Sequence, residues 1–255
     1  GVSKYFFFPG FSADTGGLIC EEGLSVQRRN WTHSPSKQRH FLEKIGLTQA
    51  QAYLDGDALF ISLFCYPSAP FRSLLHALRK SRRPVVLLVP QSVLPQLERD
   101  ASTLLRDVAT QPTSADLPGL TLLRIPFLAQ EEYDQLLWMC DLNFVRGEDS
   151  FVRAIWARKP FLWHIYEQSE NTHLKKLQAW LALFPGHEET KAMMRSWNSP
   201  SRHAYFTNQL ISVLNTPGQL DSWRRSCRTF AENLSKNKTL STSIRLFYEN
   251  AVNSG

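Results

Sequence analysis

The chain has 255 residues, enough for one large domain or two small ones, and 43% of them are hydrophobic, which is sufficient for a substantial core. It contains no uninterrupted apolar run of about 18 residues, so neither a membrane-spanning helix nor a membrane role is expected. The formal net charge is +6, which suits an anionic ligand or an acidic protein partner, but the basic clusters lack the interleaved aromatic residues of a nucleic-acid-binding module, so no nucleic-acid role is predicted.

The first fifty residues show few regular patterns. Residues 3–11 are typical of a strand that enters a turn at Pro9-Gly10, and residues 10–23 are rich in turn-forming residues, as in a connection between domains. Thr15-Gly16-Gly17 fits either a close approach of the backbone to a ligand or a plain flexible loop. A helix is predicted over residues 36–45.

From residue 58 onwards, strand patterns and helix patterns alternate. Strands are predicted over residues 58–64, 84–89, 120–125, 142–145 and 161–165, with helices between them over residues 69–80, 94–109, 130–139 and from Phe151 to a stop at Pro160. A loop rich in Pro, Ser and Asp is predicted over residues 111–119. This alternation predicts a doubly wound α/β domain, whose ligand should lie beyond the carboxyl ends of the strands.

After residue 168 the pattern changes to helices alone. They are predicted over residues 171–184, 188–197, 203–214, 218–233 and 239–252. The cysteines (Cys20, Cys65, Cys140 and Cys227) are scattered through the chain, without Cys-x-x-Cys spacing or a disulfide framework. We therefore expect a reducing cytoplasmic setting and no structural metal.

The junction at residues 145–153 is the most informative stretch. A buried strand gives way to a glycine, then to acidic and hydroxyl residues, and then to a helical pattern: Val145-Arg146-Gly147-Glu148-Asp149-Ser150-Phe151-Val152-Arg153. Free backbone N–H groups and the helix dipole make such a turn a ready site for an anion. The alternative is an ordinary capped helix in an α/β domain.

The same stretch resembles a known family. The sequences Arg-Gly-Glu-Asp-Ser-Phe-Val-Arg-Ala at residues 146–154 and Lys-Pro-Phe-Leu-Trp-His-Ile-Tyr-Glu-Gln at residues 159–168 are similar to the signature of the bacterial protein-arginine rhamnosyltransferases called EarP. Residues 4–18, 63–66 and 124–127 agree with it. The family usually has Pro at the position of Glu167. The resemblance covers most of the chain.

The resemblance implies an architecture. The chain would be the Rossmann-like C-terminal half of a GT-B glycosyltransferase, with most of the N-terminal domain absent. Residues 1–50 would form the end of that N-terminal domain and a linker, and residues 51–236 the domain that binds the nucleotide-sugar donor. Residues 237–255 would form a helix that packs back on the N-terminal domain.

The resemblance also implies an activity. The enzyme would transfer rhamnose from TDP-β-L-rhamnose to an arginine of translation elongation factor P, with inversion and without a metal or other cofactor, and so activate the factor for ribosomes stalled at polyproline. The family's acceptor-binding aspartate matches no residue of this chain, so the chain alone is expected to be inactive. The alternatives are a glycosyltransferase-like module that only binds proteins and an unrelated nucleotide-binding regulatory domain.

The diphosphate of such a donor would bind at the junction. The backbone N–H groups at the helix start and the hydroxyl of Ser150 would bind its oxygens, with Asp149 beside them, and Arg146, next to Gly147, would offer a bidentate guanidinium. The resemblance implies a catalytic role for Glu148, which would orient rhamnose or the incoming guanidinium; a helix-capping carboxylate is the alternative. Arg153 is expected to form an ion pair with Asp149, four residues earlier.

The base of the donor would need an aromatic pocket. Tyr66, Phe127 and Tyr166 each follow a predicted strand, so their rings should meet at one sheet edge and stack on thymine or pack on the ribose, although core packing is the commoner role of any one aromatic residue. Gln130 and Gln168 are candidates for hydrogen bonds to the nucleotide, and Asn171 is a weaker one. His164, within a strand, is expected to be a core residue.

Overall fold

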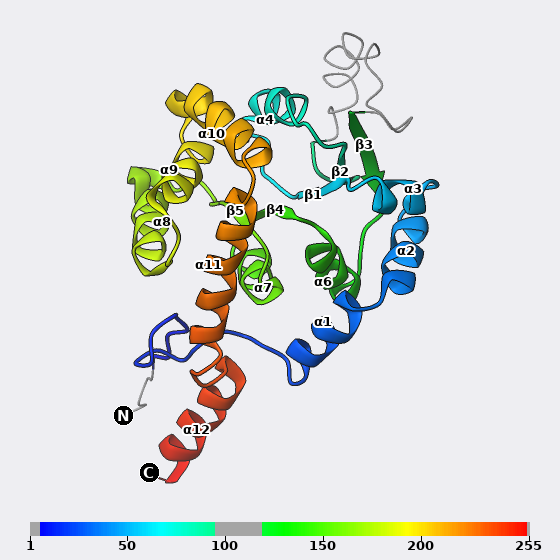
Figure 1. Ribbon diagram of the computed structural model, residues 1–255. Coiled ribbons are helices and arrows are strands. Elements are labelled where there is room, and N and C mark those ends of the chain that lie inside the picture. Colours follow the sequence, from blue (N-terminus) through cyan, green and yellow to red (C-terminus); the bar gives the residue numbers. More distant parts are fainter. Residues whose placement is uncertain (1–5, 95–118, 254–255) are drawn as a thin grey trace.

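The computed structural model describes residues 6–94 and 119–253, and its centre is a five-stranded parallel sheet (Figure 1). The strand order is β3-β2-β1-β4-β5. The strands are β1 (Leu59–Leu63), β2 (Val85–Pro90), β3 (Leu120–Ile125), β4 (Leu142–Arg146) and β5 (Phe161–His164). All five coincide with predicted strands to within one or two residues, and the predicted α/β class is confirmed.

Helices cover both faces of this sheet. In Figure 1, α4 (Phe71–Leu78) and α10 (His203–Asn215) lie on one face, and α6 (Gln130–Met139) and α7 (Asp149–Ala157) lie on the other. The central strands β1 and β2 are therefore buried on both sides, which is why their sequences are continuous apolar runs. Helix α7 ends at Ala157, where Arg158 adopts a left-handed conformation, two residues before Pro160.

The chain order of the strands reverses beside β1. From β1 the sheet grows through β2 to β3 in one direction, whereas β4 pairs with the other side of β1 and is followed by β5. The connections after β1 and β4 consequently leave toward opposite faces of the sheet. Parallel sheets bind their ligands in the crevice that such a reversal opens at the carboxyl ends of the strands.

The second half of the described chain is helical, as predicted. It contains α8 (Thr172–Leu183), α9 (Glu188–Trp197), α11 (Gln219–Leu234) and α12 (Leu240–Asn253), with short 3-10 turns at Ser169–Asn171 and Pro200–Arg202. Trp180 of α8 lies edge-on to Phe151 of α7, with ring centroids 5.2 Å apart. None of the helices in the described ranges is both long and apolar enough to cross a bilayer.

The N-terminal region differs from its prediction. Residues 6–11, the described part of the predicted strand, form no strand. They belong to a local loop in which the Gly16 N–H donates to the carbonyl of Phe8 at 2.8 Å. Helix α2 (Pro35–Lys44) was predicted, but α1 (Leu24–Thr32) and α3 (Ala50–Asp55) were not. The predicted helix over residues 94–109 and nearly all of the loop over residues 111–119 fall outside the described residues.

The missed helices carry weak sequence signals. Helix α1 buries only Leu24 and Trp31, one at each end, and α3 has only six residues, too few to show a period. Trp31 nevertheless packs against Trp138 of α6 and against Phe41 of α2, each at 6.0 Å between ring centroids. Helices α1 and α2 therefore share the core of the sheet domain. The domain boundary at residue 50 stays a prediction.

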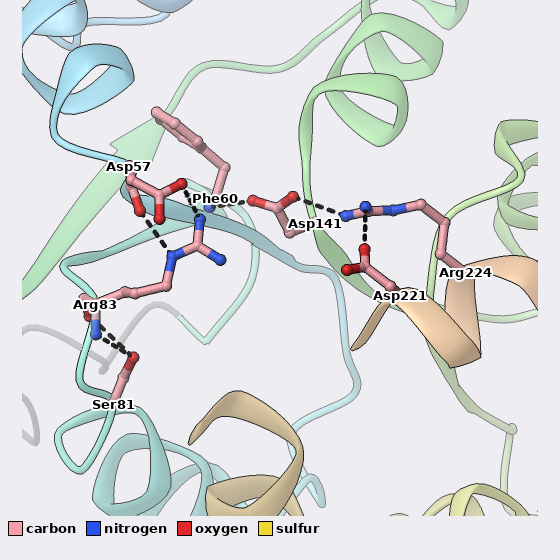
Figure 2. A network of polar contacts seen from close by, with 7 residues as sticks. All are labelled: Asp57, Phe60, Ser81, Arg83, Asp141, Asp221 and Arg224. Atoms are coloured by element: carbon pink, nitrogen blue, oxygen red, sulfur yellow. Dashed lines mark hydrogen bonds and ion pairs between the residues drawn. The ribbon is translucent and has the colours of Figure 1, made fainter. Parts of the chain in front are cut away.

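Two ion pairs lie at the amino-terminal edge of the sheet, one between two loops and one between a loop and α11 (Gln219–Leu234) (Figure 2). Arg83, before β2, donates to the backbone carbonyl and carboxylate of Asp57, before β1, at 2.8 and 2.7 Å. Asp141, before β4, accepts from the backbone N–H of Phe60 and from Arg224 of α11, both at 3.1 Å. Because these pairs are partly exposed, each adds little to stability, but together they fix the strand starts at the end opposite the candidate site.

Candidate functional site

A pocket of about 620 Å³ opens at the carboxyl ends of the strands, where the strand order reverses. Its volume is in the range of small-molecule sites. The walls come from the segments that follow β1, β2, β3 and β4, and from the first turns of α6 and α7. Most of the predicted site residues line it: Tyr66, Phe127, Gln130, Arg146, Gly147, Glu148, Asp149 and Ser150.

Gly147 forms the turn between β4 and α7. Its φ of +63° is a left-handed conformation that strains any residue with a side chain. A Cβ atom there would also lie 3.3 Å from the hydroxyl oxygen of Tyr66. The indole N–H of Trp163 donates to the Gly147 carbonyl at 2.6 Å. The turn is therefore fixed from both sides, and it exposes the start of α7 to the pocket.

Arg146 is held between aromatic rings. Its guanidinium carbon lies 4.2 Å from the ring centre of Phe64 and 5.0 Å from that of Tyr66, which is a cation–π arrangement. One guanidinium N–H donates to the carbonyl of Cys65 at 3.1 Å. The guanidinium has five N–H groups, so this anchoring leaves donors that can face an anion in the pocket.

Ser150 is buried and closes the turn. Its hydroxyl accepts from the backbone N–H of Arg146 at 3.1 Å and donates to the carbonyl of the same residue. The hydroxyl proton, which was predicted to face a diphosphate, is thus directed at the backbone. The N–H groups of Asp149, Ser150 and Phe151 begin α7, where the helix offers them no carbonyl partner.

Glu148 occupies the N-cap position of α7, but its side chain makes no capping hydrogen bond. The capping alternative is therefore wrong for this carboxylate. The side chain is 78% exposed, and its Oε1 lies 3.7 Å from the ammonium nitrogen of Lys176. Glu148 is thus a carboxylate at the rim of the pocket that the fold itself does not use as a cap.

Arg153 forms an ion pair, but not with the predicted partner. It reaches across to α6, where its Nε donates to Asp134 at 2.7 Å and a second N–H donates to the other carboxylate oxygen; it also contacts Glu21. Both Arg153 and Asp134 are buried, whereas Asp149 is exposed. The prediction failed because Arg153 lies on the face of α7 that packs against α6.

Two of the residues that were predicted to bind the nucleotide lie outside the pocket wall. Tyr166 is exposed at the rim of the pocket, and its ring centroid lies 5.5 Å from that of Tyr66. The Gln168 side chain is exposed, and its backbone N–H donates to Nδ1 of His173 at 3.2 Å. Asn171, the weaker candidate, precedes α8 and is also exposed. Phe127 lines the mouth and is 91% exposed, so a planar ligand has access to its ring.

Some residues that line the pocket were not predicted from the sequence. Phe64 was taken as the last strand residue, yet its ring lines the pocket and lies over Arg146. Tyr133 follows Gln130 by three residues on α6, a spacing that puts both on one helix face and could have revealed it. Burial raises the pKa of the Tyr133 phenol, which therefore stays neutral.

His164 is a buried core residue, as predicted. Its Nδ1 accepts the backbone N–H of Tyr66 at 3.1 Å, so the ring is neutral with its proton on Nε2. Burial lowers its pKa to about 4; the nearby Glu167 raises the pKa somewhat and Arg146 lowers it. The ring thereby fixes the segment that carries Tyr66.

The protein should lose stability as the pH falls from 6.5 towards 4. In this window the unfolded chain, whose histidine has the ordinary pKa of 6.5, takes up a proton that folded His164 does not bind. The shift corresponds to at most about 3 kcal/mol of unfolding free energy. Urea unfolding at several pH values should show a smaller slope for His164→Gln, whereas the exposed His40→Gln should keep it. Equal slopes for His164→Gln and the unsubstituted protein would contradict this account.

All four cysteines are free thiols, three of them buried. In the two described ranges, no three His, Cys, Asp or Glu side chains are grouped so as to hold a metal ion.

The sheet topology and the position of the pocket define the class: a Rossmann-like α/β domain with a pocket at the carboxyl ends of its parallel strands. A solved structure of an α,α-trehalose 6-phosphate synthase from Burkholderia multivorans shows this fold, with a TM-score of 0.51 at 11% identity, over 93% of this chain and 50% of that one. The sequence matches the family described as Elongation-Factor P (EF-P) rhamnosyltransferase EarP over residues 1–249. The chain belongs to the EarP family.

Relatives in this family are longer than the chain. A protein-arginine rhamnosyltransferase of Pseudomonas aeruginosa is 41% identical over 97% of this chain, which spans 64% of that protein. One of Pseudomonas putida is 44% identical over 71% of this chain and 46% of its own length. A solved structure described as the structural basis for EarP-mediated arginine glycosylation of EF-P matches with a TM-score of 0.74 and 31% identity, over 96% of this chain and 76% of that one.

Proposed function

We propose that this chain supplies the donor-binding half of a cytoplasmic enzyme that transfers rhamnose from TDP-β-L-rhamnose to an arginine of translation elongation factor P. The reaction would invert the anomeric carbon and use no metal or other cofactor. Support for the reaction class comes from the relatives named protein-arginine rhamnosyltransferase and from the EF-P glycosylation structure.

The observation that carries the proposal is one pocket with a cationic end and an aromatic mouth. Arg146 and the first N–H groups of α7 meet at its inner end, and Tyr66 and Phe127 lie along its wall and mouth. A nucleoside diphosphate has matching chemistry: an anionic diphosphate and a planar base. As the bond to the sugar breaks, negative charge develops on the diphosphate, and preorganised donors would stabilise it.

Glu148 is placed for the other half of the reaction. The acceptor arginine is protonated at any physiological pH, so it needs an anionic partner near the sugar. An exposed carboxylate at the pocket rim, one residue from the turn that would hold the diphosphate, can supply that partner. A carboxylate placed there could instead bind rhamnose hydroxyls, and both roles would orient the reacting groups.

Calorimetric titration with TDP, UDP, GDP and TDP-rhamnose tests the donor assignment. Selective binding of the thymidine nucleotides is expected. A preference for UDP or GDP would indicate a different nucleotide-binding protein. If the chain alone binds no nucleotide, the titration is repeated with a full-length enzyme that contains it; no binding there either would favour a module that acts only through protein contacts.

Tyr66→Ala and Phe127→Ala should each weaken TDP binding. Base–aromatic stacking contributes about 1–3 kcal/mol, which corresponds to a loss of affinity of about 5- to 150-fold. Tyr66→Ala should have the larger effect because its ring also contacts Arg146. Titration measures both, with Tyr205→Ala, on the exposed surface of α10, as the control. Unchanged affinity in both variants would remove the base-pocket assignment.

A further inference from the structure

Glu148 has a charged neighbour that does not line the pocket. The ammonium nitrogen of Lys176, on α8, lies 3.7 Å from Oε1 of Glu148. Glu148 lines the pocket and Lys176 does not, so the lysine contacts the carboxylate without being part of the pocket wall. The side chain of Lys176 is 48% exposed, so it is not a core residue.

The position of Lys176 is set by the packing of α8. The side of α8 that carries His173, Leu177 and Trp180 is buried. Trp180 packs edge-on against Phe151 of α7, and its ring centroid lies 6.3 Å from that of Trp163 of β5. Lys176 precedes Trp180 by four residues, so it lies one turn away on the same side of α8.

The same contact positions Glu148. Phe151, the ring against which Trp180 packs, follows Glu148 by three residues, about one turn of α7. Glu148 and Lys176 therefore each lie about one helical turn from the same aromatic contact between α7 and α8. The ion pair is thus a result of how the two helices are packed, and not only of two flexible side chains that meet on the surface.

We propose that Lys176 is a positioning residue for Glu148, an inference that rests on the proposed function. An exposed glutamate samples several rotamers, and a cation held beside it favours those that point towards α8 and the pocket rim. Lys176 also places a positive charge near the site where the guanidinium of the acceptor would arrive, and like charges oppose that approach. Its removal should therefore act in opposite directions on turnover and on acceptor binding.

The test is steady-state rhamnosyl transfer by a full-length enzyme that contains this chain. Lys176→Met should lower kcat by up to about fivefold, the upper limit expected for the loss of an exposed ion pair. It should leave the KM for elongation factor P unchanged or lower, and the affinity for TDP unchanged. Lys176→Arg should restore most of the turnover. Lys175→Met, which removes an exposed charge from the adjacent position of the same helix, should behave like the unsubstituted enzyme.

A double-mutant cycle excludes a general effect on the helix. In the Glu148→Gln background, Lys176→Met should cause no further decrease in kcat. Equal decreases in both backgrounds, or equal effects of Lys175→Met and Lys176→Met, would overturn the positioning role while leaving the proposed function intact. An unsubstituted enzyme that binds TDP-rhamnose and elongation factor P but transfers no rhamnose would overturn both.

Discussion

Glu148→Ala in a full-length enzyme that contains this chain should reduce turnover by about 100-fold or more and leave TDP affinity almost unchanged. A positioned carboxylate that orients reacting groups or moves a proton typically contributes about 10²–10⁴ in rate. The structure gives Glu148 no capping hydrogen bond, so its loss should not disturb the start of α7. The turn that would bind the diphosphate is fixed by other contacts, to Trp163 and within the turn itself.

Two measurements separate this role from a structural one. Single-turnover rates report the chemical step, and titration with TDP reports the donor site. Glu170→Ala serves as the control, because Glu170 is another exposed carboxylate, in the 3-10 turn that follows β5, and it does not line the pocket. A loss of binding and of rate by the same factor would mean that Glu148 supports the turn and takes no part in the reaction.

The second large effect concerns stability. Asp134→Ala should lower the unfolding free energy by about 3–5 kcal/mol, because it leaves the guanidinium of Arg153 buried without its bidentate partner. Glu21 remains in contact with that guanidinium but is half exposed and compensates only in part. Urea denaturation measures the loss directly.

A matched pair tests the role of burial. Arg158 and Glu232 form a 3.1 Å ion pair in which the glutamate is half exposed, and Arg158→Met should cost less than about 1 kcal/mol. Replacing both buried partners, in Asp134→Leu with Arg153→Met, should recover much of the loss because no charge then stays buried alone. If Asp134→Ala costs no more than Arg158→Met, the buried pair does not hold α6 and α7 together.

The strands were predictable because both faces of the sheet are covered. A strand that is buried on both sides has an almost continuous run of apolar residues, as in Val85–Pro90. Such a short apolar run is typical of a strand in a parallel sheet. Helix α1 was not predictable in the same way, because it touches the core only through Leu24 and Trp31 and its other residues satisfy no pattern. The loop at residues 6–11 was predicted to be a strand because its aromatic residues favour strands, yet no neighbouring strand pairs with it in the described structure.

The candidate site was likewise predictable only in part. Strand ends meet at one edge whatever the side chains do, so Tyr66, Phe127 and Arg146 could be brought together from the sequence. The direction of a side chain depends on the elements that pack around it, so it could not be predicted. Arg153 pairs with Asp134, and Tyr166 and Gln168 lie outside the wall of the pocket. Lys176 had no local signal at all, because its contact depends on how α8 packs on α7.

The walls of the pocket belong to segments that are far apart in the chain and meet only at one edge of the sheet. A short peptide from this protein therefore cannot form the pocket, and a partly folded chain lacks some of its walls. A ligand that binds only the complete fold shifts the folding equilibrium in proportion to its concentration relative to its Kd. In cells, the supply of such a ligand would then help to set how much of the folded protein survives degradation.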